Sequence, residues 1–105
     1  ADSAFTKLIS LQPTMSVGYL WEARIKSIQD PESINGLAKP YFEKVIEIAS
    51  PTPDKNKNDL IEAYSYLGYY YYLKKDNNTS RTYWKKVLAI TPNDERAKEA
   101  LKVIP

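Results

Sequence analysis

The sequence contains no cysteine and no histidine. Their absence excludes disulfides, thiol nucleophiles, serine–histidine–aspartate triads and the usual zinc sites built from cysteine and histidine. Only three glycines occur, Gly18, Gly36 and Gly68, and they stand far apart. A phosphate-cradling loop needs several glycines close together, so the sequence contains no such loop.

Long apolar runs are also missing. No stretch approaches the ~18 residues that cross a membrane as a helix, and no signal peptide is visible. The lack of cysteine fits both a reducing and an oxidising compartment, so it does not decide where the protein works.

The sequence also has little excess of either positive or negative charge. The 105 residues carry a formal net charge of +2, with lysine and arginine interspersed among aspartate and glutamate. This pattern predicts a solvated surface, and not a polyanion-binding patch. With 43% apolar and 27% charged residues, the composition is that of one soluble globular domain. Glu43 and Glu47 share a helix face, yet no cation or glycine loop converges on them, so we expect no active site.

The most specific feature is a tyrosine-rich stretch at residues 64–71. Its key residues are Tyr64, Leu67, Gly68 and Tyr71, followed by Ser80, Trp84, Val87 and Pro92. The stretch resembles a tetratricopeptide repeat (TPR), a helix–turn–helix unit of 34 residues with the pattern W-x2-L-G-x2-Y, then A-x3-F, then P. Tyr64, Ser80 and Trp84 replace the tryptophan, alanine and phenylalanine of that pattern.

Gly68 has a physical explanation within this pattern. Glycine inside a helix is about 1 kcal/mol less favourable than alanine, so a close packing contact must offset that cost. Tyr64, Leu67 and Tyr71 share one helix face. We expect this face to meet Trp84 of the following helix in the core.

An internal repeat extends the resemblance over the whole chain, because residues 41–48 parallel residues 83–90 almost position for position. We therefore predict an all-α fold of TPR-type helix–turn–helix repeats in a right-handed superhelical stack. Its predicted parts are the second helix of a truncated repeat at 1–13, a repeat at 16–50, a linker at 51–57, a repeat at 58–92 and a capping helix at 93–105. Residues 1–13 match only the second half of a repeat, so we expect the chain to be cut from a longer one.

Turn chemistry supports two of these boundaries. Asp76 and residues 77–79 form a turn that can cap the helix after it. Thr91 and Pro92 resemble a cap residue followed by a first helical residue. We therefore expect the last helix to start there.

The remaining tyrosines indicate where a binding surface lies. Tyr66 and Tyr70 share a helix face that we expect to pack on a neighbouring helix. In TPR proteins the first helix of each repeat lines a concave groove. The resemblance places seven residues there: Leu20, Arg24, Ser27, Ile28, Tyr69, Tyr72 and Leu73. Aromatic residues and arginine are enriched in binding hot spots. The alternative for Tyr72 and Leu73 is packing against the final helix and the linker.

The resemblance implies a non-catalytic scaffold that binds a peptide or protein partner in this groove, with no cofactor and no metal. Some TPR proteins clamp a C-terminal carboxylate with lysine and asparagine. The corresponding positions here hold Leu20, Arg24, Ser65 and Tyr69. We therefore expect no such clamp. Residues 18–24 and 37–45 are similar to TPR domains of exported Gram-negative proteins, which favours the bacterial periplasm or envelope and leaves the cytoplasm open.

Two other functions stay open at this point. One is self-association, through the groove or through the side of residues 1–12 that the missing half repeat would cover. The other is binding of single-stranded nucleic acid, with bases stacked on Tyr69 and Tyr72 and phosphates held by Arg24, Lys74 and Lys75. The small net charge argues against nucleic acid.

Overall fold

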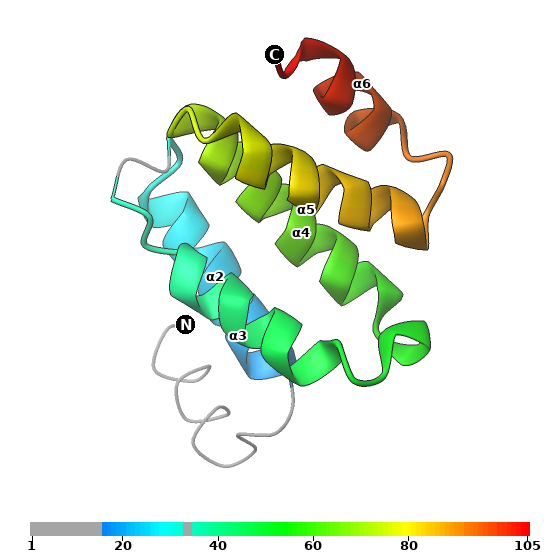
Figure 1. Ribbon diagram of the computed structural model, residues 1–105. Helices are drawn as coiled ribbons and strands as arrows, with labels where there is room; N and C mark the ends of the chain where they lie inside the picture. Colours follow the sequence, from blue (N-terminus) through cyan, green and yellow to red (C-terminus); the bar gives the residue numbers. More distant parts are fainter. Residues whose placement is uncertain (1–15, 33–34) are drawn as a thin grey trace.

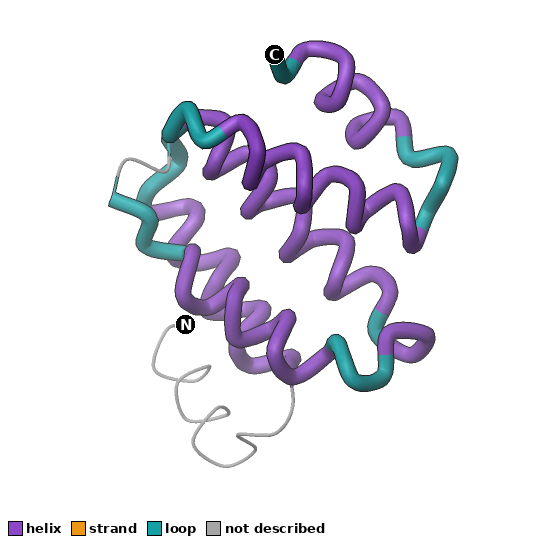
Figure 2. The backbone as a smooth tube through the Cα atoms, viewed as in Figure 1, coloured by secondary structure: helices purple, strands orange, loops and turns teal. Residues whose placement is uncertain are grey.

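The computed structural model describes residues 16–32 and 35–105 of the chain. Its α-helices are α2 (Ser16–Gln29), α3 (Lys39–Ala49), α4 (Lys57–Leu73), α5 (Asn77–Ile90) and α6 (Glu95–Val103) (Figure 1). A short 3₁₀ helix, η1 (Pro53–Lys55), lies in the linker. Every regular element in these two ranges is helical (Figure 2), so the predicted all-α fold is confirmed. The helix predicted at 1–13 lies outside the described residues.

Helix α4 ends in a tight reversal at Lys75, whose φ of 64° lies in the left-handed region. The N–H of Asp76 donates to the Tyr71 carbonyl at 2.9 Å, and the N–H of Lys75 donates to the Tyr72 carbonyl at 3.0 Å. These are the two bonds of a Schellman cap. The Asp76 carboxylate then accepts the Thr79 N–H at 3.3 Å and caps α5. The cap predicted at this turn is confirmed.

Helix α6 begins at Glu95, so the prediction that it starts at Thr91 and Pro92 is wrong. Asp94 is the cap instead, because its backbone is extended and its carboxylate accepts the Ala97 N–H at 2.9 Å. A carboxylate at this position also interacts favourably with the positive end of the helix dipole.

Each helix packs mainly on its neighbours along the chain. Helix α2 lies against α3, α3 against α4, α4 against α5, and α5 against α6 (Figure 1). Nearest-neighbour stacking of this kind is typical of repeat proteins. The handedness of the stack, its division into repeats and the capping role of α6 stay predictions.

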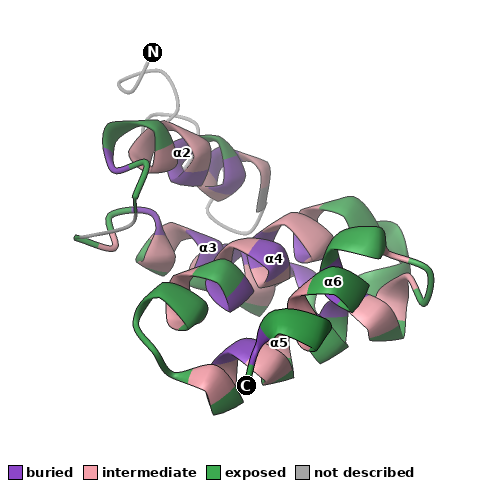
Figure 3. Ribbon diagram, turned by 90° about the horizontal axis from the view of Figure 1, so that it is seen from above, coloured by how far each residue is buried: buried purple, intermediate pink, exposed green. Residues whose placement is uncertain are grey.

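Two groups of buried side chains hold the stack together. The first joins α2, α3 and α4 through Leu20, Ala23, Ala38, Phe42, Val45 and Ala63. The second joins α5 and α6 through Trp84, Val87, Ala97 and Ile104. Figure 3 shows the buried residues turned towards neighbouring helices and a largely exposed outer side of α6. Burial of this apolar surface is the main force that holds the helices in register.

Gly68 lets α5 approach α4 at the ring of Trp84. A Cβ atom added at Gly68 would lie 2.6 Å from Nε1 and 2.8 Å from Cε2 of Trp84. Both distances are too short for a real side chain, so the close approach predicted for Gly68 is confirmed. The Ser80 hydroxyl donates to the Gly68 carbonyl at 2.6 Å and ties the same two helices together.

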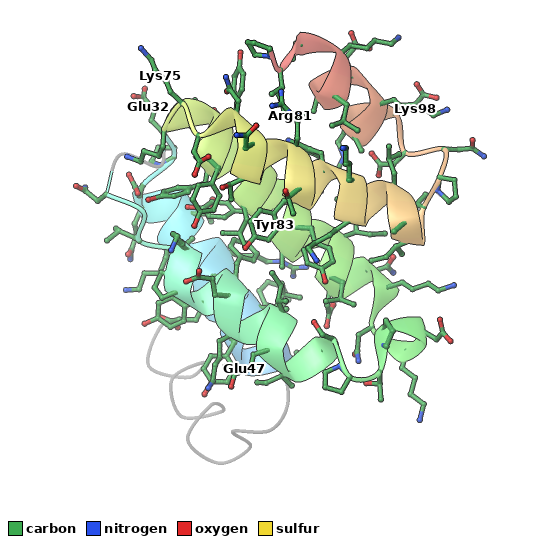
Figure 4. The ribbon with its side chains drawn as sticks, viewed as in Figure 1. Glu32, Glu47, Lys75, Arg81, Tyr83 and Lys98 are labelled. Carbon is green, nitrogen blue, oxygen red and sulfur yellow. The ribbon has the colours of Figure 1, made fainter. Side chains whose placement is uncertain are left out.

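Tyrosines fill the junction between the two helix pairs. Tyr66 of α4 stacks on Phe42 of α3 with ring centroids 4.5 Å apart. Tyr71 of α4 stacks on Tyr83 of α5, which Figure 4 labels, with centroids 5.8 Å apart. The Tyr70 ring contacts both Tyr66 and Tyr71, at 6.3 and 5.1 Å. The predicted packing of the Tyr66 face on a neighbouring helix is confirmed, and much of the tyrosine surplus serves this junction.

Candidate functional site

A groove of about 630 Å³ opens to solvent between α2, α4 and α6. Its polar and aromatic lining includes Ser27, Asn58, Glu62, Ser65, Tyr69 and Arg96. Helix α2 contributes the first of these side chains and α6 the last, while α4 supplies the others. Phe42 of α3 and Trp84 of α5 also line the groove, so all five labelled α-helices contribute to one surface.

The structure brings several of the predicted groove residues to this side. Ser27 and Tyr69 line the groove itself. Tyr72 and Leu73 line a second hollow of about 470 Å³ farther along α4. Ile28 is 77% exposed on α2 and lines neither hollow. Whether any of these residues contacts a partner stays a prediction.

Leu20 does not belong to this surface, and its predicted place in the groove is wrong. Its side chain is only 4% exposed and packs in the first core group, beside Phe42 and Ala63. Leu20 of α2, Phe42 of α3 and Ala63 of α4 belong to the same group of buried side chains. Full burial of a leucine side chain stabilises a protein by about 1.5–3 kcal/mol, so the core position is favoured.

Arg24 lies beside the groove but is held in an ion pair. Its Nε and Nη2 atoms donate to the two carboxylate oxygens of Glu62 at 2.7 and 2.6 Å. The hydrogen bond to Glu62 raises the pKa of Arg24, and the negative charges of Glu62 and Asp59 act in the same direction. The guanidinium also lies 4.6 Å from the centroid of the Trp21 ring. This two-pronged pair joins α2 to α4 and largely neutralises Arg24.

Ser65 presents an unpaired polar group at the groove. The residue is 8% exposed, and its Oγ has no hydrogen-bond partner within the part of the chain that the structure describes. A buried polar group without a partner is unfavourable by about 1–3 kcal/mol.

The site predicted from sequence omits Glu62 and Arg96. The repeat period contains a signal for Arg96, because it follows Glu62 by one TPR length of 34 residues. The pairing of Glu62 with Arg24 has no local signal, since the two side chains meet only after α2 and α4 have packed.

An apolar hollow of about 170 Å³ lies between α4 and α6. Its lining is Tyr69, Tyr72, Trp84, Ala100, Val103 and Ile104. Tyr69 and Trp84 also line the large groove, so the two spaces adjoin. The surface thus combines a polar region with an apolar one.

Among residues 16–32 and 35–105, no three histidine, cysteine, aspartate or glutamate side chains gather in a way that could hold a metal ion. None of the helices in this part of the chain combines the length and hydropathy of a transmembrane segment. The absence of an active site stays a prediction.

Stacked helix pairs, with Gly68 packed under Trp84 in the second of them, define a TPR-like domain. The chain is similar to the crystal structure of the C-terminal part of a TPR repeat-containing protein from Cytophaga hutchinsonii, with a TM-score of 0.93 and 44% sequence identity. The match covers 97% of this chain and 40% of the other. No family model matches the sequence, and no curated protein matches it. The likeness supports a general role as a protein-interaction scaffold.

Proposed function

We propose that the chain is a non-catalytic interaction module that binds a segment of a protein partner in the groove between α2, α4 and α6. The observation that carries the proposal is the groove of about 630 Å³, which takes side chains from all three helices. Its aromatic ring at Tyr69 and its cation at Arg96 belong to residue types that are enriched at interface hot spots.

The ion pairing at Arg24 argues against nucleic acid as the ligand. Both prongs of the guanidinium are bound to Glu62, so a phosphate would have to displace a carboxylate at 2.6 Å. Lys74, another candidate for phosphate contact, lies 5.5 Å from the centroid of the Tyr70 ring. With Arg24 engaged, Arg96 is the one cation that the described residues place in the lining of the groove, which is too few for a phosphate chain.

Affinity capture from the source organism tests the proposal. The baits are the unchanged chain, a Tyr69→Ala/Tyr72→Ala variant of the groove side, and a Glu47→Ala/Lys85→Ala control on the exposed surfaces of α3 and α5. We expect a partner to bind the unchanged chain and the control and to be lost from the groove variant. Circular dichroism melting curves must show that all three baits are folded.

A partner that the groove variant retains would contradict the proposal and move the binding site elsewhere. Static light scattering over a range of concentrations tests self-association as the alternative. A mass that rises with concentration in the unchanged chain, and stays monomeric in the groove variant, would identify a second copy of the chain as the partner.

A further inference from the structure

Three hollows lie in series on the side of α4 and α6, and neighbouring hollows share lining residues; together they are called the trough. The groove of about 630 Å³ and the apolar hollow of about 170 Å³ share Tyr69 and Trp84. The apolar hollow in turn shares Tyr72 and Val103 with the hollow of about 470 Å³. The trough therefore follows α4 from Asn58 to the end of the helix.

The length of the trough sets the length of its occupant. Asn58 and Leu73 are separated by about 22 Å along the axis of α4, at about 1.5 Å per residue. An extended segment of about seven residues spans that distance at about 3.3 Å per residue. An extended backbone also offers N–H and C=O groups, which need polar partners, and Asn58 and Glu62 are polar residues of the lining.

The middle of the trough selects an apolar side chain. The hollow of about 170 Å³ is lined by aromatic and aliphatic residues, without a charged one. An apolar cavity of about 150 Å³ holds a benzene ring. A hollow of this size and chemistry fits the side chain of leucine or phenylalanine, whereas a charged group would lose its hydration there.

Each end of the trough has one cationic side chain in its lining that could face a ligand. At one end Arg96 lines the groove with a side chain that is 65% exposed, and its contact with Asp94 is long, at 3.8 Å. Glu62 lines the same end, but its carboxylate is bound by Arg24. At the other end Lys75 lines the hollow of about 470 Å³. Acidic residues on both sides of an apolar one complement this distribution.

We infer that the trough binds an extended segment in which a leucine or phenylalanine is flanked on both sides by aspartate or glutamate. The inference rests on the proposed function, because it names the class of partner for the same groove. The apolar side chain fills the hollow between α4 and α6. The acidic side chains face Arg96 at one end and Lys75 at the other.

Selection of a random heptapeptide library, displayed on phage, against the whole chain tests the inference. We expect the selected peptides to carry an apolar residue with acidic residues on both sides. The most enriched peptide is then synthesised with a fluorescent label, and its Kd is measured by fluorescence polarisation for the chain and its variants.

Arg96→Glu and Lys98→Glu form a matched pair of variants. Both reverse one charge on α6, but Arg96 lines the trough, whereas Lys98 projects into solvent (Figure 4). We expect Arg96→Glu to weaken binding about five- to tenfold and Lys98→Glu less than about twofold, with the difference shrinking in high salt. Val103→Asp places a charge in the apolar hollow and should weaken binding about tenfold or more.

The outcomes separate this inference from the proposed function. Suppose that the selected peptides have basic or uncharged flanks and bind Val103→Asp more weakly than the unchanged chain. This result would contradict the inference that the segment is acidic, but it would agree with binding in the groove. Equal losses for Arg96→Glu and Lys98→Glu would overturn the assigned position of the acidic residues. Peptides unaffected by Val103→Asp, or no selected peptide at all, would contradict both proposals. Val103 is 57% exposed, and melting curves check that the variant folds.

Discussion

In the helix pair α4–α5, Gly68 lies under the indole of Trp84, whereas the corresponding positions of α2–α3 hold Ala23 and Phe42. All four residues are buried. In α4–α5 the large indole ring of Trp84 meets a glycine. In α2–α3 the smaller ring of Phe42 is paired with alanine, which has one methyl group more than glycine. The comparison teaches that the summed volume at the crossing matters more than the identity of either residue.

A second position separates the two pairs. Leu67 is fully buried in α4, while the matching residue in α2 is Glu22, which is only 4% exposed. Its Oε1 is 3.8 Å from Lys26 Nζ, and its Oε2 has no hydrogen-bond partner among the residues that the structure describes. The pair α2–α3 therefore buries a polar group where α4–α5 buries a purely apolar one. We expect the packing of α2–α3 to contribute less to stability than that of α4–α5.

The largest effect should come from removing the ring of the second pair. Trp84→Ala should lower the free energy of unfolding by about 3–5 kcal/mol, because it deletes a buried aromatic group and leaves a cavity beside Gly68. That is a large part of the roughly 5–15 kcal/mol that stabilises a domain. Urea denaturation followed by circular dichroism measures the loss, and a midpoint equal to that of the unchanged chain would remove Trp84 from the core.

Gly68→Ala should come next, with a loss of about 1–2 kcal/mol. The added methyl group meets the Trp84 ring, which is unfavourable by about 1–3 kcal/mol, while better helix propensity returns up to about 1 kcal/mol. In a Trp84→Phe background the pair matches Ala23 and Phe42, so the added methyl should be tolerated. A double-mutant cycle measures this coupling, and strictly additive effects would contradict the volume exchange.

Glu22→Leu should make the first pair more like the second. Replacing a poorly paired buried carboxylate with an apolar side chain of similar size should raise the free energy of unfolding by about 1 kcal/mol. Glu47→Leu on the exposed surface of α3 is the control, and we expect it to change stability by less than about 0.5 kcal/mol. A lower melting temperature for Glu22→Leu would show that the carboxylate has a stabilising partner.

The smallest effect should appear at alkaline pH, at the junction between the pairs. Burial raises the pKa of Tyr83 above its ordinary value of 10.0, and the nearby Tyr71 and Glu43 add to the shift, against an opposing effect of Lys39. Burial lowers the pKa of Lys39, but its hydrogen bond and charge interaction with Glu43, together with Tyr71, outweigh burial and leave that pKa raised.

For both groups the native state holds its proton more tightly than the unfolded chain does. Their contribution to stability is therefore complete below about pH 10 and is lost as the pH rises through the raised values. Melting temperatures between pH 8 and about pH 11 should fall less steeply for Tyr83→Phe than for the unchanged chain. Tyr69→Phe, at an exposed position, is the control, and identical slopes for the two variants would contradict the shift at Tyr83.

The sequence was sufficient to predict features that depend on local pattern. Helix α2 begins at Ser16, the residue where the predicted repeat at 16–50 begins; Gly68 marks the close crossing, and Asp76 caps the next helix. Each of these follows from the geometry of one helix, one turn or one repeat. Where a side chain has a single strong local preference, the neighbouring helices do not change the outcome.

Other features needed the packed structure. The face that carries Leu20 is evident from sequence, but how closely α4 approaches it is not, and that distance decides between core and groove. Arg24 shows the same limit, because Glu62 lies 38 positions away and neutralises it only after folding. The predicted start of α6 was wrong for another reason. Thr91 and Asp94 are both favourable N-cap residues, and the structure uses Asp94, whose carboxylate is the stronger hydrogen-bond acceptor.

The contact between Gly68 and Trp84 also limits the order in which descendants of this sequence can change. If alanine replaces Gly68 before Trp84 changes, the intermediate protein contains colliding atoms. If phenylalanine replaces Trp84 before Gly68 changes, the intermediate protein contains a small void. The collision places Cβ 2.6 Å from Nε1 of Trp84, so something must shift in the first intermediate, whereas the second needs no shift. Related repeats with alanine and tryptophan together at these two positions should therefore be rarer than repeats with glycine and phenylalanine.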